Sequence, residues 1–157
     1  MIILGIDPGS TRTGFGVISK EREITLITYG VIEYKRKRDN RFDELVSEVA
    51  EKLSKIINKY HPELIGIEKI YFSKNVKTGI EVAQTRGAMI LEISKYKIPI
   101  KEFSPTEVKS AITGYGLADK KAVARTVAKL LGVEKITGFD DASDALAIAL
   151  TTALSPK

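Results

Sequence analysis

Four acidic residues stand at or inside apolar segments, where a folded chain normally avoids charge: Asp7, Glu68, Asp141 and Asp144. The first two each end a short apolar run, and the other two open an apolar segment near the C-terminus. A carboxylate in or beside a core is costly unless another group compensates its charge. A shared cluster of divalent cations is the simplest compensator, so the sequence predicts a metal-dependent enzyme.

The spacing of these acids indicates how they could meet. Asp7 and Glu68 each end a predicted strand, and open α/β sheets bind ligands at the carboxyl ends of their strands. Asp141 and Asp144 are three residues apart, so on a helix they point about 60° from each other and share a face. Mg²⁺ prefers oxygen ligands, and two such ions about 3.5–4 Å apart promote phosphodiester hydrolysis.

Each acid taken alone also has an ordinary interpretation. Asp7 could belong to a turn, Glu68 could be solvated at a strand end, and Asp140 or Asp141 could cap a helix. Asp144 is harder to explain in this way, because it lies within the helix, where capping no longer applies. The combination of the acids therefore favours the metal site. The i, i+3 relation to Asp144 favours Asp141 over Asp140 as its partner.

Short apolar runs and amphipathic stretches predict the elements that must position these acids. The predicted strands are 2–7, 12–20, 24–33, 63–68 and 99–103. The predicted helices are 42–57, 78–97, 104–113, 119–131 and 140–154. Ser104, Pro105 and Glu107 form a helix-start signature with an N-cap, a proline in the first turn and a capping-box acid.

The order of these elements predicts an α/β layered fold. The first three strands have short connections and should form an antiparallel meander. The fourth and fifth strands follow helices and should run parallel to the first strand. With 157 residues and 43% hydrophobic content, the whole chain 1–157 is expected to form one domain.

Composition limits the compartment and the partners. The chain has no cysteine, no recognisable secretion signal and no apolar run of the roughly 18 residues that a membrane span needs. These features predict a cytoplasmic protein without a membrane partner. Lys and Arg number 25 against 20 Asp and Glu, and the net charge of +5 permits a polyanionic partner without requiring one. His61 precedes a proline on the opposite side of the predicted sheet and is interpreted as a surface connector.

Segments along nearly the whole chain resemble, in order and spacing, the RuvC family of bacterial Holliday-junction resolvases. In chain order they are Ile3-Leu4-Gly5-Ile6-Asp7-Pro8-Gly9-Ser10, Thr13-Gly14-Phe15-Gly16, Ile67-Glu68 followed by Tyr71, Lys74 and Asn75, Gln84-Thr85-Arg86-Gly87, Val108-Lys109, Gly114-Tyr115-Gly116, Asp119-Lys120 and the run 141–149. This agreement is far more specific than any single motif in the chain.

The resemblance implies a ribonuclease-H-like fold, a five-stranded mixed sheet flanked by helices. It also implies a homodimer that nicks four-way DNA junctions in recombination and repair, with the branch-migration proteins RuvA and RuvB as partners. The four carboxylates would then be catalytic and would bind Mg²⁺, two ions in each active site, with Mn²⁺ as a substitute. Whether Asp140 contributes to the metal site stays open.

The resemblance also implies DNA-binding residues. Tyr71 stands where the family often has a phenylalanine that contacts bases near the junction centre, and an aromatic ring there could stack on a base. Lys74 lies in the basic loop after Glu68, and Lys109 and Lys120 match family lysines near the scissile phosphate. The alternatives are loop packing for Tyr71 and solvated charge for the lysines. Arg86 could contact DNA or serve the dimer.

Other functions were compatible with parts of the sequence. The run Gly5-Ile6-Asp7-Pro8-Gly9-Ser10-Thr11 also resembles the phosphate loop of actin-like and sugar-kinase phosphotransferases. Those enzymes usually need two domains of this fold and lack the paired helical aspartates. A related nuclease acting on ribosomal RNA precursors and a non-catalytic junction binder are further alternatives, although the full acidic set argues against the binder.

The predicted helix 78–97 offers a candidate dimer interface. Ile80, Ala83, Gly87 and Ile90 lie on one side of it, at helical spacing. The same stripe could instead belong to the core, and the sequence leaves both interpretations open.

Overall fold

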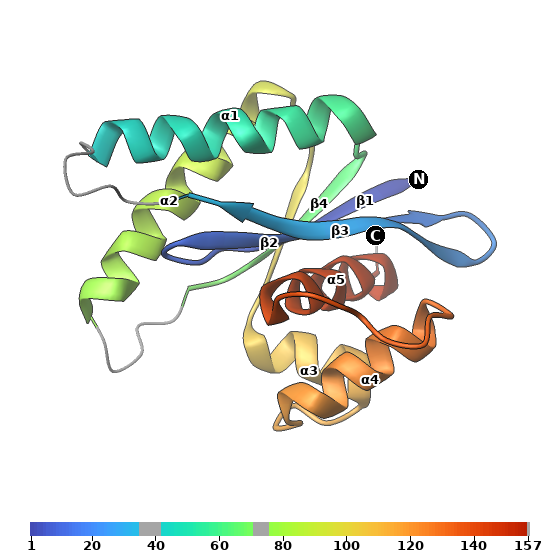
Figure 1. The fold of residues 1–157 in the computed structure, drawn as a ribbon. Coiled ribbons are helices and arrows are strands. Elements are labelled where there is room, and N and C mark those ends of the chain that lie inside the picture. The colour runs from blue at the N-terminus through green and yellow to red at the C-terminus, as the bar shows by residue number, and fades with distance from the viewer. Residues whose placement is uncertain (35–41, 71–75, 157) are drawn as a thin grey trace.

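Helices cover both faces of a five-stranded sheet in the computed structural model, which describes residues 1–34, 42–70 and 76–156 (Figure 1). The strands are β1 (Ile2–Asp7), β2 (Arg12–Lys20), β3 (Ile24–Glu33), β4 (Leu64–Glu68) and β5 (Ile100–Phe103). The helices are α1 (Phe42–Tyr60), α2 (Val76–Lys95), α3 (Pro105–Thr113), α4 (Lys120–Leu130) and α5 (Asp140–Leu154).

The sheet has the strand order β3-β2-β1-β4-β5. β1, β2 and β3 form an antiparallel meander, and β4 and β5 run parallel to β1, which confirms the predicted topology. Ile6 of β1 is paired with Ile67 of β4. The next residues along the two strands, Asp7 and Glu68, therefore leave the sheet side by side at its carboxyl edge.

Local signals in the sequence set the helix ends. The Ser104 side chain accepts a hydrogen bond from the Glu107 backbone at 3.2 Å, and the Glu107 carboxylate accepts one from the Ser104 backbone at 2.7 Å. This reciprocal pair is the predicted capping box. The predicted helix 78–97 is α2 at Val76–Lys95, and it ends early because Lys97 has a left-handed backbone with a φ of 55°.

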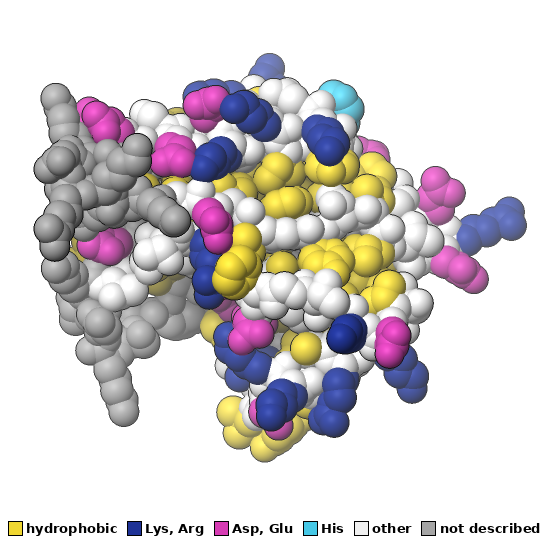
Figure 2. All heavy atoms as spheres, in the orientation of Figure 1, with side chains coloured by type: hydrophobic (Ala, Val, Ile, Leu, Met, Phe, Trp, Pro, Cys, Tyr) yellow, Lys and Arg dark blue, Asp and Glu magenta, His cyan; other side chains and the backbone are white. Residues whose placement is uncertain are grey.

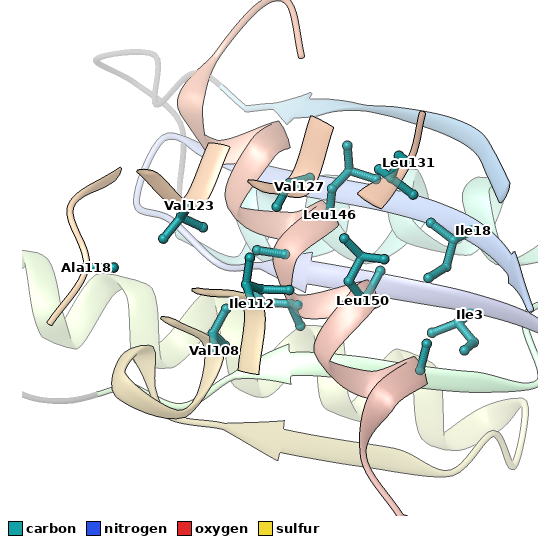
Figure 3. Packing of buried hydrophobic residues seen from close by; sticks show 14 residues of the cluster. Ile3, Ile18, Val108, Ile112, Ala118, Val123, Val127, Leu131, Leu146 and Leu150 are labelled. Atoms are coloured by element: carbon teal, nitrogen blue, oxygen red, sulfur yellow. The ribbon is translucent and has the colours of Figure 1, made fainter. Parts of the chain in front are cut away.

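Two hydrophobic cores fill the space between the sheet and its helices. Successive residues of a strand point to opposite faces, so Leu4 packs under α1 and α2 while Ile3 packs under the other layer. Figure 3 shows this second core, in which Ile3 and Ile18 of the sheet meet Leu146 and Leu150 of α5 together with side chains of α3 and α4.

α5 lies directly against the sheet because glycines of the strands leave room for its backbone. A Cβ atom added to Gly5 would lie 2.1 Å from the Ala145 carbonyl oxygen, and one added to Gly14 would lie 1.9 Å from the Asp141 carbonyl oxygen. The close approach brings the first turn of α5 to the end of β1. Among the described residues, no helix combines the length and apolar content that a membrane crossing requires.

Replacing Gly5 by alanine is expected to destabilise the fold. The new methyl group would meet backbone atoms of α5, which cannot move aside as a flexible side chain would. We expect Gly5→Ala to lower the free energy of unfolding by about 3 kcal/mol, the upper end of the usual overpacking range, measured by urea denaturation.

Gly87→Ala is the matched control, because within the subunit a Cβ atom there meets nothing within 4 Å. Its better helix propensity should raise the free energy of unfolding by up to about 1 kcal/mol. Equal effects of the two substitutions would contradict the close packing of α5 on β1.

Candidate metal centre

The four acids singled out in the sequence line one pocket of about 340 Å³. Two lysines that the sequence also indicated, Lys109 and Lys120, line the same pocket. Two acids come from the ends of the neighbouring parallel strands β1 and β4, and the other two come from the first turns of α5. The lysines enter from α3 and from the start of α4, so elements from both halves of the chain build the site.

The electrostatics of the site affect the pKa of Asp7 most strongly. Burial, followed by repulsion from Glu68, Asp144 and Asp141, raises the pKa of Asp7 to about 9. Burial also raises the pKa of Glu68, although a hydrogen bond from Asp7 acts in the opposite direction. Their mutual interaction raises the pKa of Asp7 and lowers that of Glu68, so Asp7 is the acid of this pair that holds a proton more tightly.

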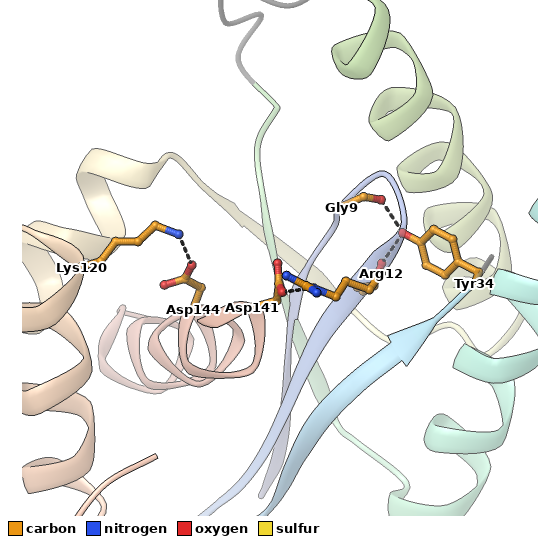
Figure 4. A network of polar contacts seen from close by, with 7 residues as sticks. Gly9, Arg12, Tyr34, Lys120, Asp141 and Asp144 are labelled. Carbon is orange, nitrogen blue, oxygen red and sulfur yellow. Dashed lines mark hydrogen bonds and ion pairs between the residues drawn. The ribbon is translucent and has the colours of Figure 1, made fainter. Parts of the chain in front are cut away.

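A lysine compensates part of the charge of Asp144. The Lys120 ammonium donates to the Asp144 carboxylate at 3.1 Å (Figure 4). Burial nevertheless raises the pKa of Asp144, against the influence of Lys120. In return, Asp144 raises the pKa of Lys120, so this lysine stays charged.

Arg12 compensates Asp141, and this partner was missed in the sequence. Its guanidinium pairs with the Asp141 carboxylate (Figure 4). It also lies 4.3 Å from the centre of the Phe139 ring, a cation–π contact. Arg12 begins β2, which runs antiparallel to β1. The start of β2 therefore lies at the same sheet edge as Asp7, and this meander geometry is the signal that could have identified Arg12.

A buried tyrosine holds the turn that follows Asp7. The Tyr34 hydroxyl donates to the Gly9 carbonyl and lies 2.9 Å from the Thr13 hydroxyl oxygen (Figure 4). Only 1% of Tyr34 is exposed, and burial raises its pKa. No motif in the sequence pointed to this tyrosine.

The chemistry of the donor set fits a hard divalent cation. The four carboxylates of the pocket outnumber the basic side chains Arg12, Lys109 and Lys120 beside them, and burial together with mutual repulsion raises the pKa of Asp7. Within the described part of the chain, no three acidic or histidine side chains are already grouped as ligands of one ion. Instead, Asp141 and Asp144 of α5 pair with Arg12 and Lys120. A bound cation would compensate the charge of these two carboxylates in place of the basic side chains.

The remaining predicted site residues divide into three groups. Asp140 is exposed and does not line the pocket, whereas Asp141 does. Arg86 lies on α2 and bonds to the carbonyl oxygen of Glu68 rather than pointing into the pocket. Tyr71 and Lys74 lie outside the described residues.

The mixed sheet with this strand order, and the acids at the ends of its central parallel strands, define a ribonuclease-H-like nuclease. The family model described as crossover junction endodeoxyribonuclease RuvC matches residues 3–152. The chain belongs to the RuvC family. Membership makes it an endodeoxyribonuclease and implies the use of a divalent metal.

Relatives and solved structures agree with this assignment. RuvC of Petrotoga mobilis is 46% identical over 95% of this chain and 91% of its own length. RuvC of Caldicellulosiruptor saccharolyticus is 42% identical over 99% of this chain and 93% of its own length. The structure of Thermus thermophilus RuvC in complex with a Holliday junction substrate matches with a TM-score of 0.89 and 28% identity, over 98% of this chain and 93% of that one.

Proposed function

We propose that this chain resolves Holliday junctions by nicking their DNA strands symmetrically at the pocket of the four carboxylates. The observation that carries the proposal is the convergence of these carboxylates, flanked by two lysines, in a member of a family of junction endonucleases. The solved relative bound to a Holliday junction supports the same substrate. The comparisons give no support to a phosphotransferase or to a nuclease acting on ribosomal RNA precursors.

In this proposal the four acids hold Mg²⁺, two ions in each active site, with Mn²⁺ as a substitute. When bound, the metal supplies Lewis-acid stabilisation of the charge that develops on the phosphate during hydrolysis. Lys109 and Lys120 place further positive charge beside that phosphate. Because Asp144 raises the pKa of Lys120, this side chain keeps its charge throughout the neutral range.

The surface next to the pocket suits a DNA backbone. α4 carries Lys120, Lys121, Arg125 and Lys129 within its 11 residues. Figure 2 shows basic side chains gathered on the lower part of the molecule, where Figure 1 places α4. Lysine contacts to phosphates give affinity without sequence preference. Tyr71 and Lys74 stay predicted DNA contacts, on the strength of the family resemblance.

The proposal includes a homodimer formed through α2. Ile80 and Leu91 on its outer face are 48% and 65% exposed, and Ala83 and Gly87 lie between them at helical spacing. This apolar stripe faces away from the core side of α2. Ile90, which the sequence assigned to the same stripe, is half-buried and packs against the core instead, so Leu91 takes its place.

Three further assignments stay predictions. Residues 1–157 act as one domain, which is supported by two cores packed on a single sheet. Partnership with RuvA and RuvB rests on the family alone. A cytoplasmic location rests on the absence of cysteine from the sequence and on the proposed DNA substrate.

A charge in the α2 stripe should separate the subunits. Leu91→Glu would bury an unpaired carboxylate at the proposed interface, which is costly, and we expect the dimer dissociation constant to rise by at least about tenfold, equivalent to about 1.4 kcal/mol. Sedimentation velocity measures this change. Leu130→Glu, at a 47% exposed leucine on α4, is the control and should leave the sedimenting mass unchanged. A Leu91→Glu protein that sediments like wild type would rule out this interface.

The proposed function is tested by comparing substrates under one set of conditions. Wild-type protein with Mg²⁺ should nick a synthetic four-way DNA junction at symmetry-related positions and leave a linear duplex of the same sequence intact. An excess of unlabelled DNA junction should inhibit the reaction, and structured RNA should not. Cleavage of RNA in preference to the junction, or ATP binding without DNA affinity, would favour the alternatives instead.

A further inference from the structure

Arg86 of α2 bonds to the main chain that carries one of the four acids. Its Nε donates to the carbonyl oxygen of Glu68 at 2.9 Å, and its Nη2 pairs with the Glu102 carboxylate of β5. Only 15% of the Arg86 side chain is exposed, whereas 47% of the Glu102 side chain is exposed. The planar guanidinium thus uses two of its donors, in fixed directions, to join α2 to the ends of β4 and β5.

The Glu68 carbonyl that Arg86 bonds lies at the end of β4, where the strand leaves the sheet. β4 ends at Glu68, and the next backbone donor, Lys69 N, is still held by the Phe103 carbonyl at 2.8 Å. A bond to the Glu68 carbonyl fixes the orientation of the last peptide of the strand. That orientation sets the direction in which the Glu68 side chain leaves the sheet toward the pocket.

A separate contact braces the neighbouring strand end. The Tyr34 hydroxyl donates to the Gly9 carbonyl, two residues beyond Asp7. The hydroxyl of Thr85, the completely buried residue before Arg86, donates within its own helix, to the carbonyl oxygens of Glu81 and Val82. The contact from α2 to the backbone of an inner acid is therefore the one that Arg86 makes to Glu68.

These contacts argue against a phosphate contact by Arg86. Its charge is already balanced by Glu102, and its side chain is mostly covered. Binding a phosphate would break the pair and leave the Glu68 carbonyl without this donor.

We propose that Arg86 is a positioning residue that holds Glu68 in place for metal binding, and that it does not contact the junction. The proposal rests on the proposed nuclease function of the pocket. Groups that orient metal ligands typically change metal affinity or activity by about 10- to 100-fold when they are removed. Lysine cannot replace arginine here, because a single ammonium lacks the rigid fork that reaches both partners.

The test separates positioning from DNA binding. Arg86→Gln should bind a four-way junction in the absence of metal with the wild-type dissociation constant and the wild-type dependence on salt. At saturating junction its turnover should fall by about 10- to 100-fold. Mn²⁺ binding without DNA, measured by calorimetry, should weaken by a similar factor. Lys109→Gln is the contrasting variant, and its junction affinity should fall together with its salt dependence.

Weaker junction binding by Arg86→Gln with a smaller salt dependence would overturn the proposal, because it would make Arg86 a phosphate contact. Unchanged Mn²⁺ binding and turnover would overturn it as well. If Arg86→Gln does not fold, as judged by thermal unfolding, Arg86→Lys keeps the charge and most of the packing and should show the same loss of turnover at unchanged junction affinity. If wild type does not nick junctions, the proposed function fails, and the Mn²⁺ measurement still decides the role of Arg86.

Discussion

Asp7→Asn is expected to reduce junction nicking by at least about a thousandfold while leaving junction binding intact. The negative charges of the other three acids all act on Asp7 and raise its pKa. An amide in place of the Asp7 carboxylate is a poorer ligand for a divalent cation. Metal-ion catalysis contributes several kcal/mol to transition-state stabilisation, and each 1.4 kcal/mol corresponds to a factor of ten in rate. Single-turnover nicking with Mg²⁺ measures the loss.

The same substitution should stabilise the metal-free fold. Wild-type Asp7 must stay protonated in the folded protein at neutral pH, whereas the unfolded chain releases that proton freely. Asparagine has no proton to release, so folding no longer requires a carboxyl group to be protonated. We therefore expect the free energy of unfolding at pH 7 to rise by at least about 1 kcal/mol. A variant that is both less active and less stable than wild type would indicate damage to the fold in place of a lost metal ligand.

Metal-free wild-type protein is expected to lose stability as the pH rises. The folded-state pKa of Asp7, about 9, lies above its ordinary value of 3.8, so the folded protein binds a proton that the unfolded chain has released between these two values. The free energy of unfolding should therefore fall across this window, by up to about 1.4 kcal/mol per pH unit from this one group. Glu68 and Asp144, whose pKa values burial also raises, act in the same direction.

Mg²⁺ should reverse this trend, because a cation in the pocket compensates the ionised acids. Its stabilising effect follows from binding to the folded state alone and should be larger at pH 8 than at pH 5. Urea denaturation between about pH 5 and 8, with EDTA or Mg²⁺, measures both effects. The Asp7→Asn protein should show a flatter pH dependence. Stability that rises with pH in EDTA would contradict the proposed electrostatics of the pocket.

Much of the site could be predicted because its key residues end apolar runs. Asp7 and Glu68 follow short buried strands, and the short connections among the first three strands leave little choice but a meander. The spacing of Asp141 and Asp144 puts them on one face of a helix. The spacing could not predict where that helix lies on the sheet, because its position depends on the close contact of its backbone with Gly5 and Gly14.

The residues that were missed, or whose role was left open, act through contacts distant in sequence. Arg12 and Asp141 are 129 positions apart, and the pair exists because β2 and α5 begin at the same edge of the sheet. Arg86 was singled out by its motif, although its bond to the Glu68 carbonyl depends on the packing of α2 against two strand ends. Tyr34 carries no motif, and its role follows from its burial beside the turn after Asp7.

The most direct test of the metal site compares two adjacent aspartates. Asp141 lines the pocket and Asp140 is exposed beside it, so the two differ in position by one residue and not in chemistry. In Mg²⁺-dependent nicking of a four-way junction, Asp141→Asn should lose nearly all activity, and Asp140→Asn should retain the wild-type rate. An Asp141→Asn protein that nicks junctions as wild type does, or an Asp140→Asn protein that loses as much activity, would contradict the proposed catalytic centre.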